Sequence, residues 1–343
     1  MNRPGRFDLM REAVADGWDG DGDETPPRVV TEVRRETAQS AITRNTSPDL
    51  PFDRSVNVYR GCEHGCIYCF ARPSHGFLGM SPGLDFETRL IMRPNIAQVL
   101  ETELRRPSYK VAPIAMGTNT DPYQPIEATA GLTRQVLEVL SRFNHPVTIV
   151  TKGCMIERDI DLIAPMAKRG LLRVGVSITT LDAELSRRME PRAPAPERRL
   201  RCVSCLTQAG VPVRVMVAPV IPGLTDTEIE AILTKARAAG ATSASRILLR
   251  LPREVAELWR GWLTEHYPDR APGVMARLRD MHGGRDYDPR FGHRMSGQGA
   301  YADLIAQRFR LMVKRLGYTA TESPLSCDLF AVPPGPGDQL SLF

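Results

Sequence analysis

The chain has 343 residues, enough to bury the core of one large α/β domain with appendages or of two ordinary domains. Hydrophobic residues make up 42% and charged residues 25%, the balance of a globular protein, and the net charge is a modest +5. The first residues lack an apolar signal region and no window approaches ~18 apolar residues, so we expect neither export nor a membrane span and place the protein in the cytoplasm.

The composition changes along the chain and suggests four parts. Residues 1–50 are polar, rich in Gly, Asp and Arg, and only weakly periodic, which predicts a mobile or loosely docked leader. We expect a core over residues 51–252, a helical and basic extension over 253–330, and a Pro/Gly linker with a short tail over 331–343.

The first motif lies in residues 59–73, YRGCEHGCIYCFARP, which follow a short strand expected at 55–59. Cys62, Cys66 and Cys69 stand in a CxxxCxxC spacing, with Tyr68 before the last cysteine. Three of seven cysteines within eight residues argue against disulfides and for metal binding. A cluster of four irons takes four thiolates, so three would leave one iron open to another ligand.

The other cysteines leave alternatives open. They are either small buried residues or, for the CxxC pair at 202 and 205, part of a second metal site. These four are Cys154, Cys202, Cys205 and Cys327. A zinc site is the competing interpretation of the first motif, with His64 or His75 as the fourth ligand.

A regular alternation of strand, loop and helix follows the cysteine motif. The expected strands after it are 111–116, 147–151, 171–179, 211–220 and 245–251. Helices with apolar faces separate them, which is typical of a parallel sheet covered by helices. Six units are too few to close an eightfold barrel, so we predict an α/β fold with a partial (βα)6 barrel and a C-terminal helical extension.

In such folds the functional residues gather on the loops that follow the strands. Those loops carry Thr118, Asn119, Thr120 and Asp121, then Lys152, then Ser177 with Glu190 and Arg192, and finally the turn 217–226. Each alone has a structural alternative, because a lysine is often a surface residue, a serine can cap a helix, and Glu190 with Arg192 can form an exposed ion pair. Their shared position at strand ends favours a binding site.

Together these residues resemble the radical S-adenosylmethionine (SAM) superfamily, through CxxxCxxC with an aromatic residue before the third cysteine. The TKG, SIT, EPR and VIPGLTD segments are similar to the spore photoproduct lyase branch, and the chain resembles an uncharacterised bacterial family near that branch. The resemblance covers about residues 50–330 and implies a [4Fe–4S] cluster and SAM as cofactors.

The resemblance also implies roles for single residues. Cys62, Cys66 and Cys69 would ligate three irons, and the amino and carboxylate groups of SAM would chelate the fourth. Around SAM, the implied contacts are Tyr68 near the adenine, Lys152 and Ser177 at the methionine and ribose part, Glu190 at the ribose, and Val220 to Gly223 at the adenine. Thr118 and Asn119 stand where the family has a Gly-Gly-Glu clamp, and TKG replaces the lyase TKS.

The implied activity is reductive cleavage of SAM to a 5′-deoxyadenosyl radical that abstracts hydrogen from a substrate, in a lyase-like or transferase-like enzyme. The electron would come from a flavodoxin-like or ferredoxin-like donor. Nucleic acid is a candidate substrate and DNA repair a candidate role. The alternative from a different class is an adaptor protein whose cluster is structural.

The basic extension is the first pointer to a partner. Residues 243–315 hold 14 Lys and Arg against 8 Asp and Glu, a surplus of six that either faces phosphate or is solvated. Basic and aromatic residues interleave there, at Arg285, Tyr287, Arg290, Phe291, His293 and Arg294. They would line a nucleic-acid channel, close a lid over a small substrate, or simply pack.

The chain's last residues are the second pointer. Gln339, Leu340, Ser341, Leu342 and Phe343 resemble the bacterial sliding-clamp binding motif, QL(S/D)LF. Exposed leucines and a phenylalanine on a flexible tail favour a partner pocket. The alternative is that the tail folds back on its own domain.

Overall fold

The structure is a computed structural model that describes residues 30–334. Its centre is a seven-stranded sheet in the order β10-β9-β8-β7-β6-β3-β2. The strands from β10 to β3 in this order are parallel to their neighbours, and β2 is antiparallel to β3. The strands are β2 (Ile42–Arg44), β3 (Arg54–Val56), β6 (Ile114–Met116), β7 (Val147–Thr151), β8 (Leu172–Ser177), β9 (Val213–Val220) and β10 (Ser243–Leu248). The α/β prediction is confirmed, and the open sheet is compatible with a partial barrel.

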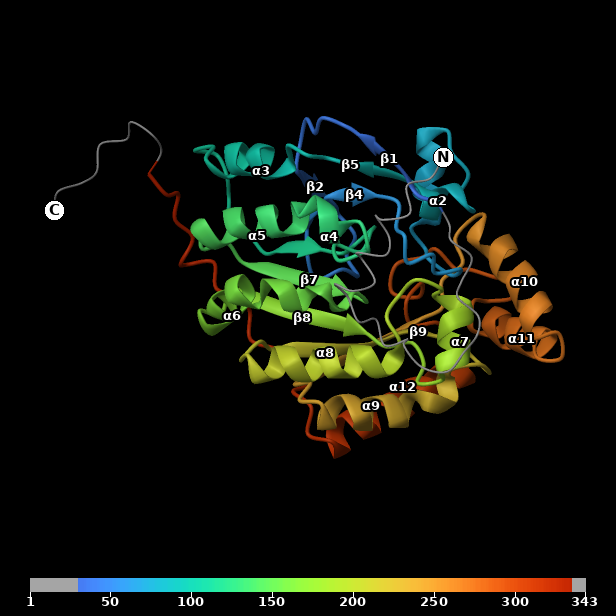
Figure 1. The fold of residues 1–343 in the computed structure, drawn as a ribbon. Helices are drawn as coiled ribbons and strands as arrows, with labels where there is room; N and C mark the ends of the chain where they lie inside the picture. Colours follow the sequence, from blue (N-terminus) through green and yellow to red (C-terminus); the bar gives the residue numbers. More distant parts are fainter. Residues whose placement is uncertain (1–29, 335–343) are drawn as a thin grey trace.

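Helices between the parallel strands cover the outer face of this sheet (Figure 1). They are α3 (Ile96–Leu104), α5 (Leu132–Arg142), α6 (Ile160–Lys168), α8 (Pro196–Gln208) and α9 (Ile229–Ala238). The apolar faces read from the sequence are the buried ones: in α5, Leu132, Val136 and Leu140 all lie in the core. Strand burial follows the same logic, because β9 buries Val213, Val215 and Val217 against these helices.

A small second sheet in the order β1-β5-β4 supports the segment that carries the cysteines. Its strands are β1 (Glu32–Arg35), β5 (Arg89–Met92) and β4 (Tyr59–Arg60). The sequence predicted no strand before residue 51, yet β1 and β2 both lie there. The prediction of a mobile or loosely docked leader is therefore wrong for these two strands. β1, EVRR, is exposed along its whole length, and pairing through its backbone leaves no hydrophobic alternation to detect. Residues 1–29 lie outside the described residues.

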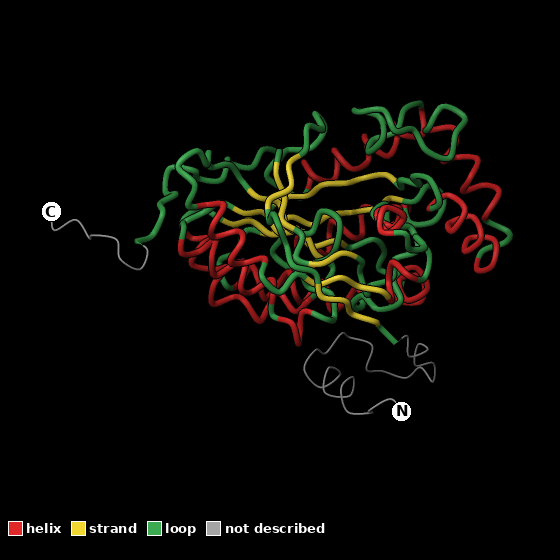
Figure 2. The backbone as a smooth tube through the Cα atoms, turned by 90° about the horizontal axis from the view of Figure 1, so that it is seen from above, coloured by secondary structure: helices red, strands yellow, loops and turns green. Residues whose placement is uncertain are grey.

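The extension after β10 forms α10 (Val255–His266), α11 (Ala271–Met281) and α12 (Ala300–Arg315). α10 and α11 lie beyond the carboxyl ends of the strands, whereas residues 319–334 run along the opposite end (Figures 1 and 2). α12 buries Ile305 and Phe309, while Leu304 is exposed. The division at residues 252 and 330 stays a prediction. Within residues 30–334 we find no helix with the length and apolar character that crossing a bilayer requires.

Glu322 fastens the last segment to the amino ends of three strands. Its carboxylate pairs with Arg173 of β8 (2.6 Å) and Arg214 of β9 (Nε, 3.1 Å), and Ser243 of β10 donates a hydrogen bond to it. Burial would raise the pKa of Glu322, but the hydrogen bonds from Ser243 and Arg214 and the nearby arginine charges lower it below its usual value.

Because the pKa of Glu322 is lowered in the folded state, its carboxylate stabilises the protein at pH values above the ordinary pKa of a glutamate. This stabilisation is lost as the pH falls through the lowered pKa. We therefore expect Glu322→Gln to cost about 1.5–3 kcal/mol of unfolding free energy near neutral pH and much less near about pH 3. Urea unfolding at both pH values measures this difference. An equal cost at both would contradict it.

One further segment links the two edges of the open sheet. Residues 284–299 attach to β10 through a backbone hydrogen bond from Leu248 to Met295 (2.9 Å). From the same segment, Arg294 forms a bidentate pair with Asp49 (2.7 and 2.5 Å), which lies between β2 and β3 at the other edge. The segment therefore spans the open side of the sheet.

Candidate functional site

A cavity lies at the carboxyl ends of the parallel strands, where the predicted site loops meet. The cysteine loop forms one wall, and the segments after β6, β7 and β10 form the others together with residues of β8 and β9 themselves. The predicted site residues that line it are Cys62, Cys66, Cys69, Tyr68, Thr118, Asn119, Lys152 and Ser177. These eight residues therefore lie together around one cavity, and their roles toward a cluster or SAM stay predictions.

The cysteine loop depends on two glycines in the left-handed region, Gly61 (φ +82°) and Gly65 (φ +67°). A Cβ on Gly61 would lie 2.7 Å from Phe86 O, and one on Gly65 would overlap the Glu87 carboxylate, so both positions exclude other residues. The tight loop turns all three thiols toward the same cavity. Cys62 and Cys66 are buried, and Cys69 is half-buried.

Arg72 holds this loop from behind. Its side chain is 1% exposed, and its guanidinium donates to the carbonyls of Gly65 and Cys66 (both 2.9 Å) and of Gly83 (2.7 Å). It also lies over the Phe86 ring, 5.5 Å from the centroid. A planar group with five donors suits this task because one side chain can bind several loop carbonyls at once.

The loop after β6 clamps the front of the cysteine loop. Gln124 accepts a hydrogen bond from the Glu63 backbone (2.8 Å) and donates one to Gly61 O (3.2 Å), while the Glu63 carboxylate accepts from the Ile126 backbone (2.5 Å). These bonds join residues more than sixty positions apart in the chain. They fix the thiols relative to Thr118 and Asn119.

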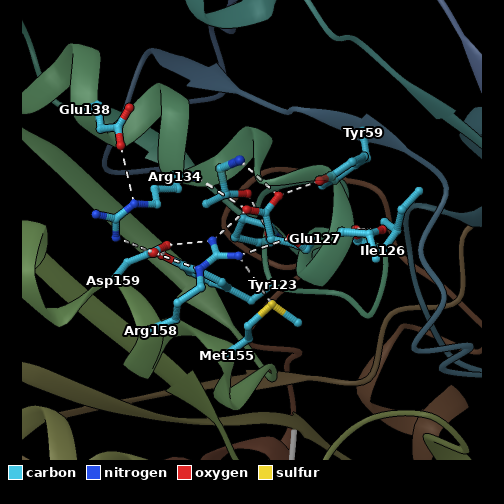
Figure 3. A network of polar contacts seen from close by, with 12 residues as sticks. Tyr59, Tyr123, Ile126, Glu127, Arg134, Glu138, Met155, Arg158 and Asp159 are labelled. Carbon is cyan, nitrogen blue, oxygen red and sulfur yellow. Dashed lines mark hydrogen bonds and ion pairs between the residues drawn. The ribbon is translucent and has the colours of Figure 1, made fainter. Parts of the chain in front are cut away.

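A buried polar network supports both loops from below (Figure 3). Glu127 accepts hydrogen bonds from the Tyr59 hydroxyl and from Arg158 (2.8 Å), and Arg158 also binds Asp159 (2.9 Å). Asp159 in turn accepts from Tyr123 (3.1 Å). The network therefore joins β4, which leads into the cysteine loop, to the segments after β6 and β7.

Asp121 organises the next wall of the cavity. It accepts hydrogen bonds from the Thr151 hydroxyl (2.5 Å) and the Lys152 backbone (2.7 Å), and its Oδ2 lies 3.3 Å from His64 Nδ1. Burial would raise the pKa of Asp121, but His64 and these hydrogen bonds lower it to about 2. An anionic Asp121 thus fixes the turn from which Lys152 projects.

Glu190 is fully buried and is not among the residues that line the cavity. Its carboxylate accepts from the Tyr68 hydroxyl, from Thr179 (2.7 Å) and from Arg199, and Lys152 Nζ lies 4.0 Å away. Burial would raise its pKa, but the charges of Arg199 and Lys152 and these hydrogen bonds hold the pKa at about 2.

In this arrangement Glu190 positions two cavity residues. It anchors the hydroxyl of Tyr68, and its partner Arg199 donates to the carbonyl of Ser177 (3.2 Å). Val220 and Gly223, predicted at the adenine, also lie outside the cavity lining, where Ala218 and Pro219 of the same turn are found instead. The SAM contacts predicted for these three residues stay predictions.

Phe70 and Arg250 also line the cavity, although the sequence did not single them out, and His64 lines it too, having been named only as a possible zinc ligand. Phe70 directly follows Cys69, so its position beside the cysteine motif could have placed it at the site. Arg250 follows the last strand, as the other site residues follow theirs, but no motif surrounds it.

The thiols suit an iron–sulfur cluster by their number and arrangement. Within residues 30–334, no group of three or more His, Cys, Asp or Glu side chains is placed to hold a single metal ion. Three ligands of a four-iron cluster each bind a different iron, so they surround a volume rather than converge on a point. The other four cysteines all lie in the described part of the chain and none lines the cavity.

The model of the radical SAM superfamily matches residues 56–236, which is more than half of the chain. The chain belongs to the radical SAM superfamily. Proteins of the radical SAM superfamily use a [4Fe–4S] cluster and SAM, and they need an electron donor. The match begins in β3 and ends in α9, so it contains the cysteine loop and four of the five other strand-end loops.

The relatives agree with this assignment. An uncharacterised protein of Mycobacterium tuberculosis is 40% identical over 277 residues, covering 80% of this chain and 78% of the relative. One of Methanocaldococcus jannaschii is 26% identical over half of this chain and 62% of its own length. Among solved structures, spore photoproduct lyase complexed with a dinucleoside spore photoproduct matches with a TM-score of 0.58 and 14% identity, covering 83% of this chain and 80% of that one. This similarity shows a shared fold.

Proposed function

We propose that this radical SAM protein is an enzyme that cleaves SAM reductively and uses the radical on a substrate. The observation that carries the proposal is the convergence on one cavity of Cys62, Cys66 and Cys69 with Lys152 and Ser177. The three thiolates would ligate three irons, and the absence of a fourth cysteine among the cavity's described residues leaves one iron for SAM. A bound cluster would supply the electron that splits SAM into methionine and a 5′-deoxyadenosyl radical able to abstract hydrogen.

The chain's own residues would bind SAM and shield it. Lys152 offers an ammonium group to a carboxylate, and Thr118 and Asn119 offer polar atoms where the family's amino-group clamp stands. Tyr68, held by Glu190, presents a rigid ring between the thiols and Lys152, whose Nζ lies 5.7 Å from the ring centroid. The apolar side chains of Val150 and Leu248 limit the water that reaches the cavity.

Anaerobic reconstitution tests the proposal. Wild-type protein loaded with iron and sulfide, then treated with dithionite and SAM, is expected to form 5′-deoxyadenosine, measured by chromatography. Cys62→Ala should retain less iron and form no 5′-deoxyadenosine. Its two remaining thiolates could not hold a cluster in which only one iron is free to bind SAM. The control is Cys327→Ala, which removes a thiol remote from the cavity and should leave product formation unchanged. No product from the wild type would contradict the enzymatic proposal and favour a structural cluster.

The tail supports a second, compatible proposal about recruitment. Residues 339–343 lie outside the described residues, so the recruitment proposal is supported by the QLSLF sequence alone. We propose that they bind the DNA sliding clamp and bring the enzyme to DNA. A pulldown with purified clamp should lose the protein when residues 339–343 are deleted. Equal recovery with and without the deletion would remove this proposal.

A further inference from the structure

Three exposed phenylalanines each have an arginine over the ring, and one of these pairs lines the cavity. The pairs are Phe70 with Arg250 (4.6 Å from Cζ to the ring centroid), Phe77 with Arg253 (5.6 Å) and Phe291 with Arg294 (4.8 Å). The three phenylalanines are 43%, 79% and 54% exposed. We call these six residues the Phe–Arg rim. Large exposed aromatic rings mark an interaction site.

The rim continues directly from the cavity wall. Phe70 follows Cys69 in the chain, and both Phe70 and Arg250 line the cavity itself. Arg253 lies three residues beyond Arg250, and Phe291 belongs to the segment 284–299 that attaches to the end of β10. A molecule lying on the rim would therefore touch the entrance through which a substrate reaches the thiols.

Two guanidinium groups of the rim have no anionic partner. Arg250 and Arg253 form no hydrogen bond or ion pair with any residue in 30–334, and the buried Nε of Arg250 has no acceptor. The other arginines near the cysteine loop are paired: Arg72 and Arg192 with Glu87, and Arg199 with Glu190. An unpaired cation beside a cavity favours an anionic ligand.

The backbone at Arg253 also indicates a functional position. Its φ is +52°, a left-handed conformation that costs free energy for a residue with a long side chain. Only Asn144 shares a positive φ among the described residues other than glycine. This conformation keeps Arg253 over the exposed ring of Phe77.

Stacking surfaces combined with unpaired guanidinium groups match one chemical class in particular. Single-stranded nucleic acid offers flat bases that stack on aromatic rings and phosphates that bind arginine. A duplex hides its bases, whereas an enzyme that acts on a base must take it out of the stack. We propose that the Phe–Arg rim binds single-stranded nucleic acid and directs one nucleotide into the cavity. This inference rests on the proposed radical SAM activity, of which it names the substrate class.

Fluorescence anisotropy with a labelled single-stranded DNA oligonucleotide of about 12 nucleotides tests the rim, using the reconstituted full-length protein. Wild-type binding should weaken as salt rises. The variant Phe77→Ala/Arg253→Ala should bind roughly 5- to 150-fold more weakly, the range for loss of one stacked base. Both side chains are exposed, so we expect the variant to fold and to retain its cluster.

The matched control is Leu311→Ala/Arg315→Ala, which removes an exposed apolar residue and an arginine from α12. It should bind the oligonucleotide like the wild type. Formation of 5′-deoxyadenosine with dithionite is measured on the same samples and separates the two proposals. If SAM is cleaved but the oligonucleotide does not bind, or if both double variants bind like the wild type, the rim proposal is overturned.

A second class of partner gives a distinct result. An acidic electron-transfer protein would also suit exposed rings with unpaired arginines. In that case Phe77→Ala/Arg253→Ala would slow SAM cleavage driven by reduced flavodoxin, leave cleavage driven by dithionite unchanged, and bind the oligonucleotide normally. This combination would assign the rim to the electron donor and overturn the nucleic-acid proposal.

Discussion

Replacing Glu190 by alanine is expected to lower the free energy of unfolding by about 3–5 kcal/mol, the cost of leaving a buried charge without its partner. Arg199 is buried and would lose its carboxylate, and Lys152 would lose the anion 4.0 Å away. The Tyr68 hydroxyl would lose its acceptor at the same time. Chemical denaturation of the cluster-free protein measures the loss.

Two further variants of this region isolate the charge. Glu190→Gln keeps a hydrogen-bonding group of similar size, so it should cost less than alanine while leaving Arg199 and Lys152 unneutralised. Glu184→Ala, in helix α7 (Ala183–Met189), which ends just before Glu190, removes a carboxylate whose side chain is 71% exposed and pairs with Arg188. It should change stability by less than about 1 kcal/mol. A loss in Glu190→Ala no greater than in this control would refute the role of the buried charge.

Arg72→Ala is expected to give the second large effect, on the assembly of the cluster. The carbonyls of Gly65 and Gly83 would lose their donor, and each unsatisfied buried group costs about 1–3 kcal/mol. The Cys66 carbonyl would keep only the bond from the Cys69 backbone (3.1 Å). With the loop no longer held, its three thiols would not keep their arrangement. We expect the iron content after reconstitution to fall well below that of the wild type, together with the visible absorbance of the cluster.

Arg72→Lys and Arg89→Ala are the controls for this prediction. Lysine retains the charge but not the planar set of donors, so it should recover only part of the iron. Arg89 lies in the neighbouring strand β5 with a side chain that is 56% exposed and ion pairs of 3.5 and 3.8 Å. Its removal should leave the iron content unchanged. Normal iron in Arg72→Ala would show that the loop needs no such support.

The sequence predicted the parallel strands well because buried strands and amphipathic helices each leave a periodic pattern. β9 and α5 are clear examples, with apolar residues at the positions that the core requires. It could not reveal β1 and β2, which are only four and three residues long and mostly exposed, so they carry no clear alternation of buried and exposed residues. Backbone pairing has no side-chain signature.

For the site, proximity in sequence decided what was predictable. The three cysteines lie in one loop, and the lining residues Lys152 and Ser177 end strands that were themselves recognised. Nothing local in the sequence shows that Glu190 bonds to Arg199, nine residues later, and to Tyr68, in the first loop. Arg72 and Arg199 were missed for the same reason, since arginine is usually exposed and only the tertiary structure buries it.

The pair between Asp49 and Arg294 has a consequence for the order of events during synthesis. Its two residues are 245 positions apart, so the open side of the sheet stays unbridged until most of the chain has left the ribosome. The cysteine loop is made near the start, and the segment that spans the opening is made near the end. The nascent protein thus has a long interval in which iron and sulfide have direct access to the three thiols.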